Sequence, residues 1–110
     1  GQTVKKFLPS AYGTLMSAND AQFLTHLMSQ VVEIGTGSAM RGASYTVAGK
    51  TGSAEFEAGK ETHSWFVGFA PADKPKVAIC VLAEESGSGG AVAAPIARQV
   101  LDRYFTKYGQ

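Results

Sequence analysis

Residues 49–53, GKTGS, place a lysine ammonium, two hydroxyls and two glycines next to one another in the chain. The surrounding residues are rich in β-formers, so we expect a strand here. Side chains alternate between the two faces of a strand, so Thr51 and Ser53 share one face and Lys50 points to the other. The two hydroxyls can donate hydrogen bonds to a carboxylate. Lys50 can supply charge, and Gly52 can let a substrate backbone approach. One interpretation is therefore an anion site on a strand.

Two other interpretations of the cluster compete with the anion site. The letters GKT end the phosphate-loop pattern G-x-x-x-x-G-K-[ST], but that pattern needs glycine at position 44, where the chain has Ser44. It also needs a helix directly after the threonine, and GSAEF shows no helical pattern. The third interpretation is a bulged edge strand with glycines at a twist. On the cluster alone the bulged strand is favoured, whereas the shared face of the two hydroxyls favours the anion site.

The bulk properties of the chain limit what could surround this cluster. With 110 residues, it fits one small domain. The formal net charge is +1 and no basic run is present, so we expect no nucleic-acid partner. No apolar run approaches the ~20 residues of a membrane helix. We expect any export signal or anchor to lie outside this chain.

Two segments have the apolar spacing of amphipathic helices. The first begins with Asn19 as the expected N-cap, with Gln22 closing a capping box, and is expected to stop at Gly35 and Gly37. Its apolar positions are Phe23, Leu24, Leu27, Met28, Val31 and Val32. The second helix has Pro95 in its first turn. Its apolar positions are Ile96, Ala97, Val100, Leu101 and Tyr104.

Three strands are expected between the helices, over residues 44–56, 63–70 and 76–85. Their short connections imply antiparallel neighbours, so the fold class is α+β: a three-strand meander with N- and C-terminal helices. The third strand is almost continuously apolar and is expected to be buried on both faces. The first helix looks small as a cover for the second face of the sheet. The Gly87–Gly90 segment is interpreted as a flexible connection.

The order of several motifs resembles the C-terminal part of penicillin-binding protein transpeptidase domains. GKTGSAE is followed by HSWFVGFAP, then an apolar strand, then a glycine-rich loop that enters AAPIARQVLDRYF. Upstream, MSQVVEIGTGSAM is similar to the family's helix and GTG segment. The resemblance covers roughly residues 20–106 and implies a partial transpeptidase fold. We interpret residues 1–16 as a connecting arm and residues 17–110 as the C-terminal segment of the domain.

The resemblance implies a reaction and a role for each residue of the cluster. In the family, the serine of an S-x-x-K motif attacks a D-Ala-D-Ala stem peptide, and a second peptide's amine resolves the acyl-enzyme. β-Lactams mimic the first peptide, and substrate lies along the K-T-G strand. By this resemblance, Lys50 is the catalytic lysine, which helps to set the electrostatic field and the protonation state of the site. Thr51 and Ser53 bind the carboxylate, Gly52 is the motif glycine, and the Ser53 backbone N–H is an oxyanion-hole donor.

The chain departs from the family at the nucleophile. No serine begins an S-x-x-K motif, and the nearest sequence is Ser38-Ala39-Met40-Arg41. Arginine cannot act as a base in a protein. Ser17-Ala18-Asn19 spells Ser-x-Asn, but it stands at a helix start, where both residue types are common caps. We therefore expect a piece of a larger serine D,D-transpeptidase that is inactive alone. The alternatives are a segment of a non-catalytic β-lactam sensor, or a folding or interaction module.

The expected partners follow from the same resemblance. They are a peptidoglycan stem peptide or a β-lactam, and the N-terminal half of the domain. The complete protein is expected to work outside the cytoplasmic membrane, to which regions absent from this chain would anchor it. An uncovered sheet with open edges favours association, so we also expect a homo-oligomer, with the arm at residues 1–16 as the element most suited to swap.

The remaining candidate residues point to no cofactor and no metal. His26, His63 and Cys80 lack the spacing of metal ligands. We interpret the histidines as solvent-edge or capping residues, and Cys80, inside an apolar run, as a buried thiol. Trp65 and Phe66 occupy successive strand positions, and we expect both to pack in the core.

Overall fold

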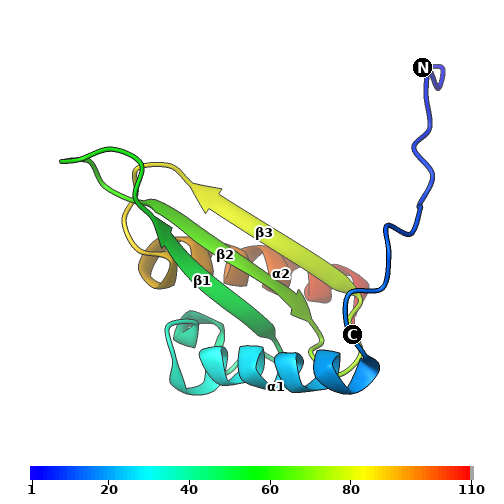
Figure 1. The fold of residues 1–110 in the computed structure, drawn as a ribbon, viewed down its shortest axis with the longest axis horizontal. Helices are drawn as coiled ribbons and strands as arrows, with labels where there is room; N and C mark the ends of the chain where they lie inside the picture. Colours follow the sequence, from blue (N-terminus) through cyan, green and yellow to red (C-terminus); the bar gives the residue numbers. More distant parts are fainter. Residues whose placement is uncertain (110) are drawn as a thin grey trace.

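The computed structural model describes residues 1–109 of the chain, and Figure 1 shows their arrangement. The first regular element begins at Ala18, and the arm before it runs extended and exposed. The elements in chain order are α1 (Ala18–Ile34), the short 3-10 helix η1 (Ser38–Met40), β1 (Ala48–Ala54), β2 (His63–Ala70), β3 (Val77–Ala83), the π-helical turn η2 (Gly89–Ala93) and α2 (Ala94–Tyr108).

The three strands form one antiparallel sheet in the order β1-β2-β3, which confirms the expected α+β meander. Thr51 of β1 lies opposite Phe66 of β2, and Val67 of β2 lies opposite Cys80 of β3. In Figure 1, α2 runs behind the sheet, whereas α1 lies on the β1 side. We call the face that α2 covers the inner face and the opposite one the outer face.

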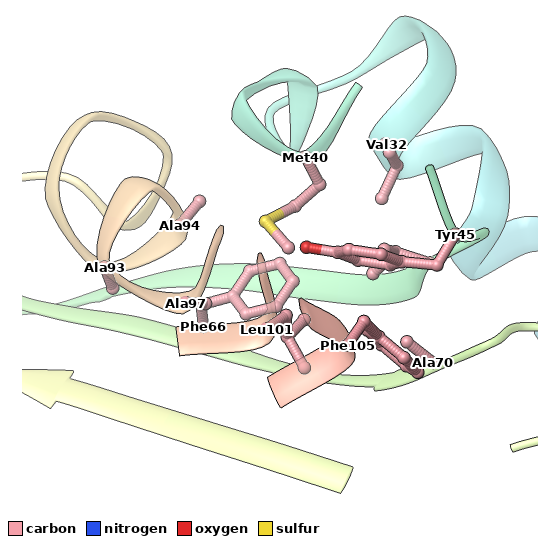
Figure 2. Packing of buried hydrophobic residues seen from close by; sticks show 11 residues of the cluster. Val32, Met40, Tyr45, Phe66, Ala70, Ala93, Ala94, Ala97, Leu101 and Phe105 are labelled. Carbon is pink, nitrogen blue, oxygen red and sulfur yellow. The ribbon is translucent and has the colours of Figure 1, made fainter. Parts of the chain in front are cut away.

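The core lies between the inner face and α2. Phe66 and Leu101 are fully buried, and burial of one such side chain contributes roughly 1.5–3 kcal/mol. Figure 2 shows Met40 pointing from η1 toward this layer, next to Tyr45. The core cluster comprises Val32, Met40, Tyr45, Val47, Phe66, Ala70, Ala93, Ala94, Ala97, Leu101 and Phe105.

The outer face of the sheet is largely uncovered, and this corrects the expectation for the third strand. Exposure alternates along β3, and Cys80 is an exposed thiol rather than a buried one. Val67 and Leu82 are 41% and 45% exposed. The physical reason is that α2 covers one face only, while Met28 of α1 reaches the other face at a hollow of about 400 Å³ that Val67 and Cys80 also line.

Both α-helices form where the apolar spacing predicts them. The N-cap of α1 is Ser17, whose Oγ accepts the N–H of Asp20 at 3.1 Å, so the expectation of an Asn19 cap was wrong. The helix ends before Gly35, as predicted. Only part of its apolar stripe is buried: Val32 lies in the core, whereas Phe23 is 64% exposed. In α2 a proline stands in the first turn, which confirms the role expected of Pro95.

Candidate functional site

The K-T-G residues lie on β1, an edge strand of the sheet. Thr51 is buried on the inner face, whereas the Lys50 side chain is exposed, as the alternation predicts. The Lys50 ammonium turns back to its own strand and donates a hydrogen bond of 2.7 Å to the Thr51 carbonyl. The positive charge therefore lies against the backbone of the K-T-G strand.

The Thr51 hydroxyl is paired with a residue that the sequence patterns did not single out. Thr51 is 9% exposed, and its Oγ1 lies 2.5 Å from Oγ1 of Thr36. Thr36 stands between α1 and η1, inside the G-T-G segment, for which the sequence predicted the end of the first helix and a resemblance to the family but no site residue. The contact joins this segment directly to the K-T-G strand.

Ser53 is exposed, and its hydroxyl is oriented by the backbone of η2. The N–H of Gly89 donates to Ser53 Oγ at 3.2 Å. A hydroxyl that accepts a hydrogen bond retains its own hydrogen for a further acceptor. Because Gly89 N–H can only donate, the contact leaves the Ser53 hydrogen to point elsewhere. The Ser53 hydroxyl can thus still donate a hydrogen bond to another group.

The glycine-rich segment before α2 is packed on the sheet, so the expectation of a flexible connection was wrong. Gly89 is buried, and a Cβ on it would stand 2.5 Å from the carbonyl oxygen of Gly52 and would also clash with the carbonyl of Trp65. A Cβ on Gly90 would stand 2.6 Å from the carbonyl oxygen of Thr36. Glycine is needed at both positions because two backbones cross without room for a side chain.

Buried Ser64 of β2 fastens this crossing to the sheet. Its hydroxyl donates to the Ser88 carbonyl at 2.8 Å and accepts the Ala93 N–H at 3.0 Å. Gly52 lies between the crossing and the outer face, where a Cβ on it would stand 3.3 Å from Cβ of Trp65. Three segments far apart in sequence therefore meet around Thr51 and Gly52: the G-T-G segment contacts Thr51 and η2, and η2 contacts Gly52.

The other aromatic and histidine candidates have local roles. His63 stacks on Phe56 with ring centroids 4.1 Å apart, and its Nδ1 accepts the N–H of Glu85 at 3.1 Å. This confirms its interpretation as a capping residue. Phe66 packs in the core as expected, whereas Trp65 is only partly buried on the outer face.

The arrangement at β1 suits recognition of an extended, anionic peptide. An edge strand offers its backbone to a second strand, and hydroxyl donors beside a lysine suit a carboxylate. Within residues 1–109, no group of three or more His, Cys, Asp or Glu side chains could hold a metal ion. Ser38, the nearest approach to an S-x-x-K motif, lies in η1 and is exposed.

Comparison with known proteins places this arrangement among related chains. Residues 8–102 match the family model described as the penicillin binding protein transpeptidase domain. The chain is 39% identical over 88 residues to peptidoglycan D,D-transpeptidase MrdA of Haemophilus influenzae, an alignment that covers 66% of this chain and 14% of MrdA. The chain therefore spans about a seventh of the length of that relative.

Solved structures of related proteins share the fold, among them the following two. One is the D,D-transpeptidase domain of a peptidoglycan glycosyltransferase from Eggerthella lenta, with a TM-score of 0.76 and 33% identity over 94% of this chain and 24% of that one. The other is penicillin-binding protein A from M. tuberculosis as a ceftriaxone acyl-enzyme complex, with a TM-score of 0.68 and 38% identity over 76% of this chain and 20% of that one.

Proposed function

The chain belongs to the penicillin-binding protein transpeptidase family, and from this membership we propose that it is part of a serine D,D-transpeptidase that cross-links peptidoglycan stem peptides. The observation that carries the proposal is the placement of the K-T-G residues on an edge strand, with Thr51 and Ser53 held on one face by neighbouring segments. This placement suits a strand along which a peptide ending in a carboxylate is bound and acylated.

We assign each residue of the cluster a role in that reaction. Thr51 and Ser53 bind the carboxylate of the stem peptide or β-lactam, and Gly52 keeps the strand free of a side chain between them. The Ser53 backbone N–H donates to the oxyanion, an interaction whose loss typically costs ~2.7–4 kcal/mol of transition-state stabilisation. Lys50 is the catalytic lysine. Its charge at the β1 backbone supports a role in setting the field of the site.

We propose that the nucleophilic serine comes from another part of the domain, because the 110 residues contain no S-x-x-K motif. In this proposal residues 17–110 form the C-terminal segment of the domain and residues 1–16 connect it to the preceding part. The complete protein acts outside the cytoplasmic membrane and is anchored through regions beyond this chain. Within the described residues, neither α-helix has the length and apolar character to cross a membrane.

The uncovered outer face supports a further partner proposal. Val67 and Leu82 leave an apolar surface on a sheet that has two open edges, β1 and β3. The arm at residues 1–16 carries exposed Val4, Phe7 and Tyr12. We propose that the chain by itself associates with a second copy, in which the arm of one copy packs on the sheet of the other.

Acylation kinetics of a complete transpeptidase that carries this segment test the proposed function. Thr51→Ala removes a hydrogen bond to a charged group, so we expect acylation by penicillin about tenfold to a hundredfold slower. Lys50→Ala should also slow acylation. Lys74→Ala, on the β2–β3 turn, is the matched control for a lost surface charge. Wild-type acylation rates in both Thr51→Ala and Lys50→Ala would contradict the site assignment. Acylation without cross-linking of stem peptides would favour a β-lactam sensor.

A further inference from the structure

Thr36 is held firmly over the Thr51 hydroxyl. The N–H groups of Gly35 and Gly37, on either side of it, both donate to the Val31 carbonyl, at 3.1 and 2.9 Å. Gly90 of η2 approaches the Thr36 carbonyl so closely that no Cβ would fit there. The backbone of Thr36 is therefore fixed by α1 on one side and by η2 on the other.

Burial is distributed unequally between the two threonines. Thr36 is exposed, whereas Thr51 is 9% exposed. Their hydroxyl oxygens lie 2.5 Å apart, and either can be the donor. Each hydroxyl has one hydrogen and two lone pairs, so the donor in this pair has no hydrogen left for a third group. The direction of the bond thus decides whether Thr51 can donate to a substrate.

A bound carboxylate selects one direction. A carboxylate only accepts hydrogen bonds, so Thr51 must donate to it and must then accept from Thr36. The chain Thr36 to Thr51 to carboxylate aligns the dipoles of both bonds, which strengthens them. Ser53 has the same pattern, because it accepts from the Gly89 N–H and keeps its own hydrogen.

We propose that Thr36 is a positioning residue of the transpeptidase reaction. Its hydroxyl donates to Thr51 Oγ1 and directs the Thr51 hydrogen toward the carboxylate of the stem peptide or β-lactam. The inference rests on the proposed function of Thr51. It assigns the G-T-G segment a part in substrate recognition in addition to ending α1.

The test is the acylation rate of a complete transpeptidase that carries this segment, measured with benzylpenicillin and with its methyl ester. Thr36→Val keeps the shape but removes the hydroxyl, and we expect acylation by the acid to slow about fivefold. Thr36→Ser keeps the hydroxyl and should restore most of the rate. The ester has no carboxylate anion, so Thr36→Val should change its rate much less.

A double-mutant cycle separates this inference from the proposed function. If Thr36 acts through Thr51, Thr36→Val has little further effect in a Thr51→Ala background. Full additivity would overturn the inference, as would equal slowing of acid and ester. Faster acylation of Thr36→Val by the acid would show that Thr51 is the donor and would also overturn it. If Thr51→Ala itself acylated at the wild-type rate, the proposed function of Thr51 would fail first.

Discussion

The Tyr45 hydroxyl donates a hydrogen bond of 2.6 Å to Oδ1 of Asp102, which ties the segment entering β1 to α2. Asp102 also accepts from Nε of Arg98, at 2.9 and 3.0 Å from its two oxygens. The Arg98 guanidinium continues to the carbonyls of Ala39 and Arg41. One acidic residue of α2 thus helps to hold both η1 and the entry to the K-T-G strand.

Removing this hydroxyl should weaken the fold without disturbing the core. Tyr45→Phe keeps the ring, which packs on Phe105 with centroids 4.4 Å apart, and leaves Asp102 paired with Arg98. We expect the free energy of unfolding to fall by about 1 kcal/mol, measured by urea titration. Tyr12→Phe, in the exposed arm, is the matched control and should cause no change. Equal stability of Tyr45→Phe and wild type would contradict a stabilising role for the bond.

Because of the same contact, the free energy of unfolding should depend on pH in the alkaline range. Burial, together with the Asp102 hydrogen bond, raises the pKa of the Tyr45 phenol above its ordinary value of about 10. In the unfolded chain the phenol ionises near that value, whereas the folded chain keeps it protonated. Its stabilising contribution is therefore complete below about pH 10 and is lost as the pH rises further. Wild type should therefore lose stability more steeply than Tyr45→Phe as the pH rises above about 10. Parallel pH profiles would contradict this assignment.

The chain alone should form no covalent adduct with a penicillin. The physical reason is that no serine in the sequence has the lysine partner of an S-x-x-K motif. Intact-mass spectrometry after incubation with excess benzylpenicillin should show the unmodified mass. A complete transpeptidase treated in parallel is the positive control. Stoichiometric addition of penicillin to a serine of this chain would show that it carries its own nucleophile.

Gly89→Ala should destabilise the packing of η2 on the sheet. The added methyl would overlap the backbone of Gly52 and Trp65, so one strand or the turn must shift. Overpacking of this kind typically costs about 1–3 kcal/mol, which thermal unfolding can measure. Gly13→Ala is the matched control, because a Cβ there meets nothing within 4 Å. If Gly89→Ala and Gly13→Ala unfolded at the same temperature, the close backbone crossing would not exist in solution.

The uncovered sheet should make the isolated chain oligomeric. A stable interface of standard size buries about 1,600 Å² in total. We expect light scattering over a concentration series to report a dimer or larger species. Leu82→Lys, on the outer face, should shift it toward monomer, whereas Ile96→Lys, on α2 and similarly exposed at 41%, should not. A monodisperse monomer at high concentration would rule out association through this face.

Local sequence patterns predicted those features of the site that lie within a single strand or helix. The alternation of side chains along a strand predicted that Thr51 and Lys50 point to opposite faces. The apolar spacing of the helix, followed by Gly35, predicted where α1 ends. Both features depend on residues that are neighbours in sequence. The Thr36–Thr51 contact joins residues 15 positions apart through a loop whose path has no periodicity, so no local pattern could reveal it.

Two errors have the same origin in long-range packing. A glycine allows either flexibility or a close approach, and only the position of β1 shows that Gly89 serves the second purpose. An apolar run predicts burial, but the exposure of Cys80 depends on which faces of the sheet other elements cover. Sequence patterns predict the strand or loop itself, whereas the elements packed around it decide which of its residues are buried.

The crossing of η2 over β1 also constrains how this site can diverge among relatives. Gly90 approaches the backbone of Thr36, and Gly89 approaches that of Gly52, so neither glycine can gain a side chain unless its neighbour moves. Substitutions at these positions therefore meet a steric barrier made of backbone atoms, which a change of a neighbouring side chain does not remove. Across homologues, positions 89 and 90 should therefore keep glycine wherever η2 crosses the K-T-G strand at this distance.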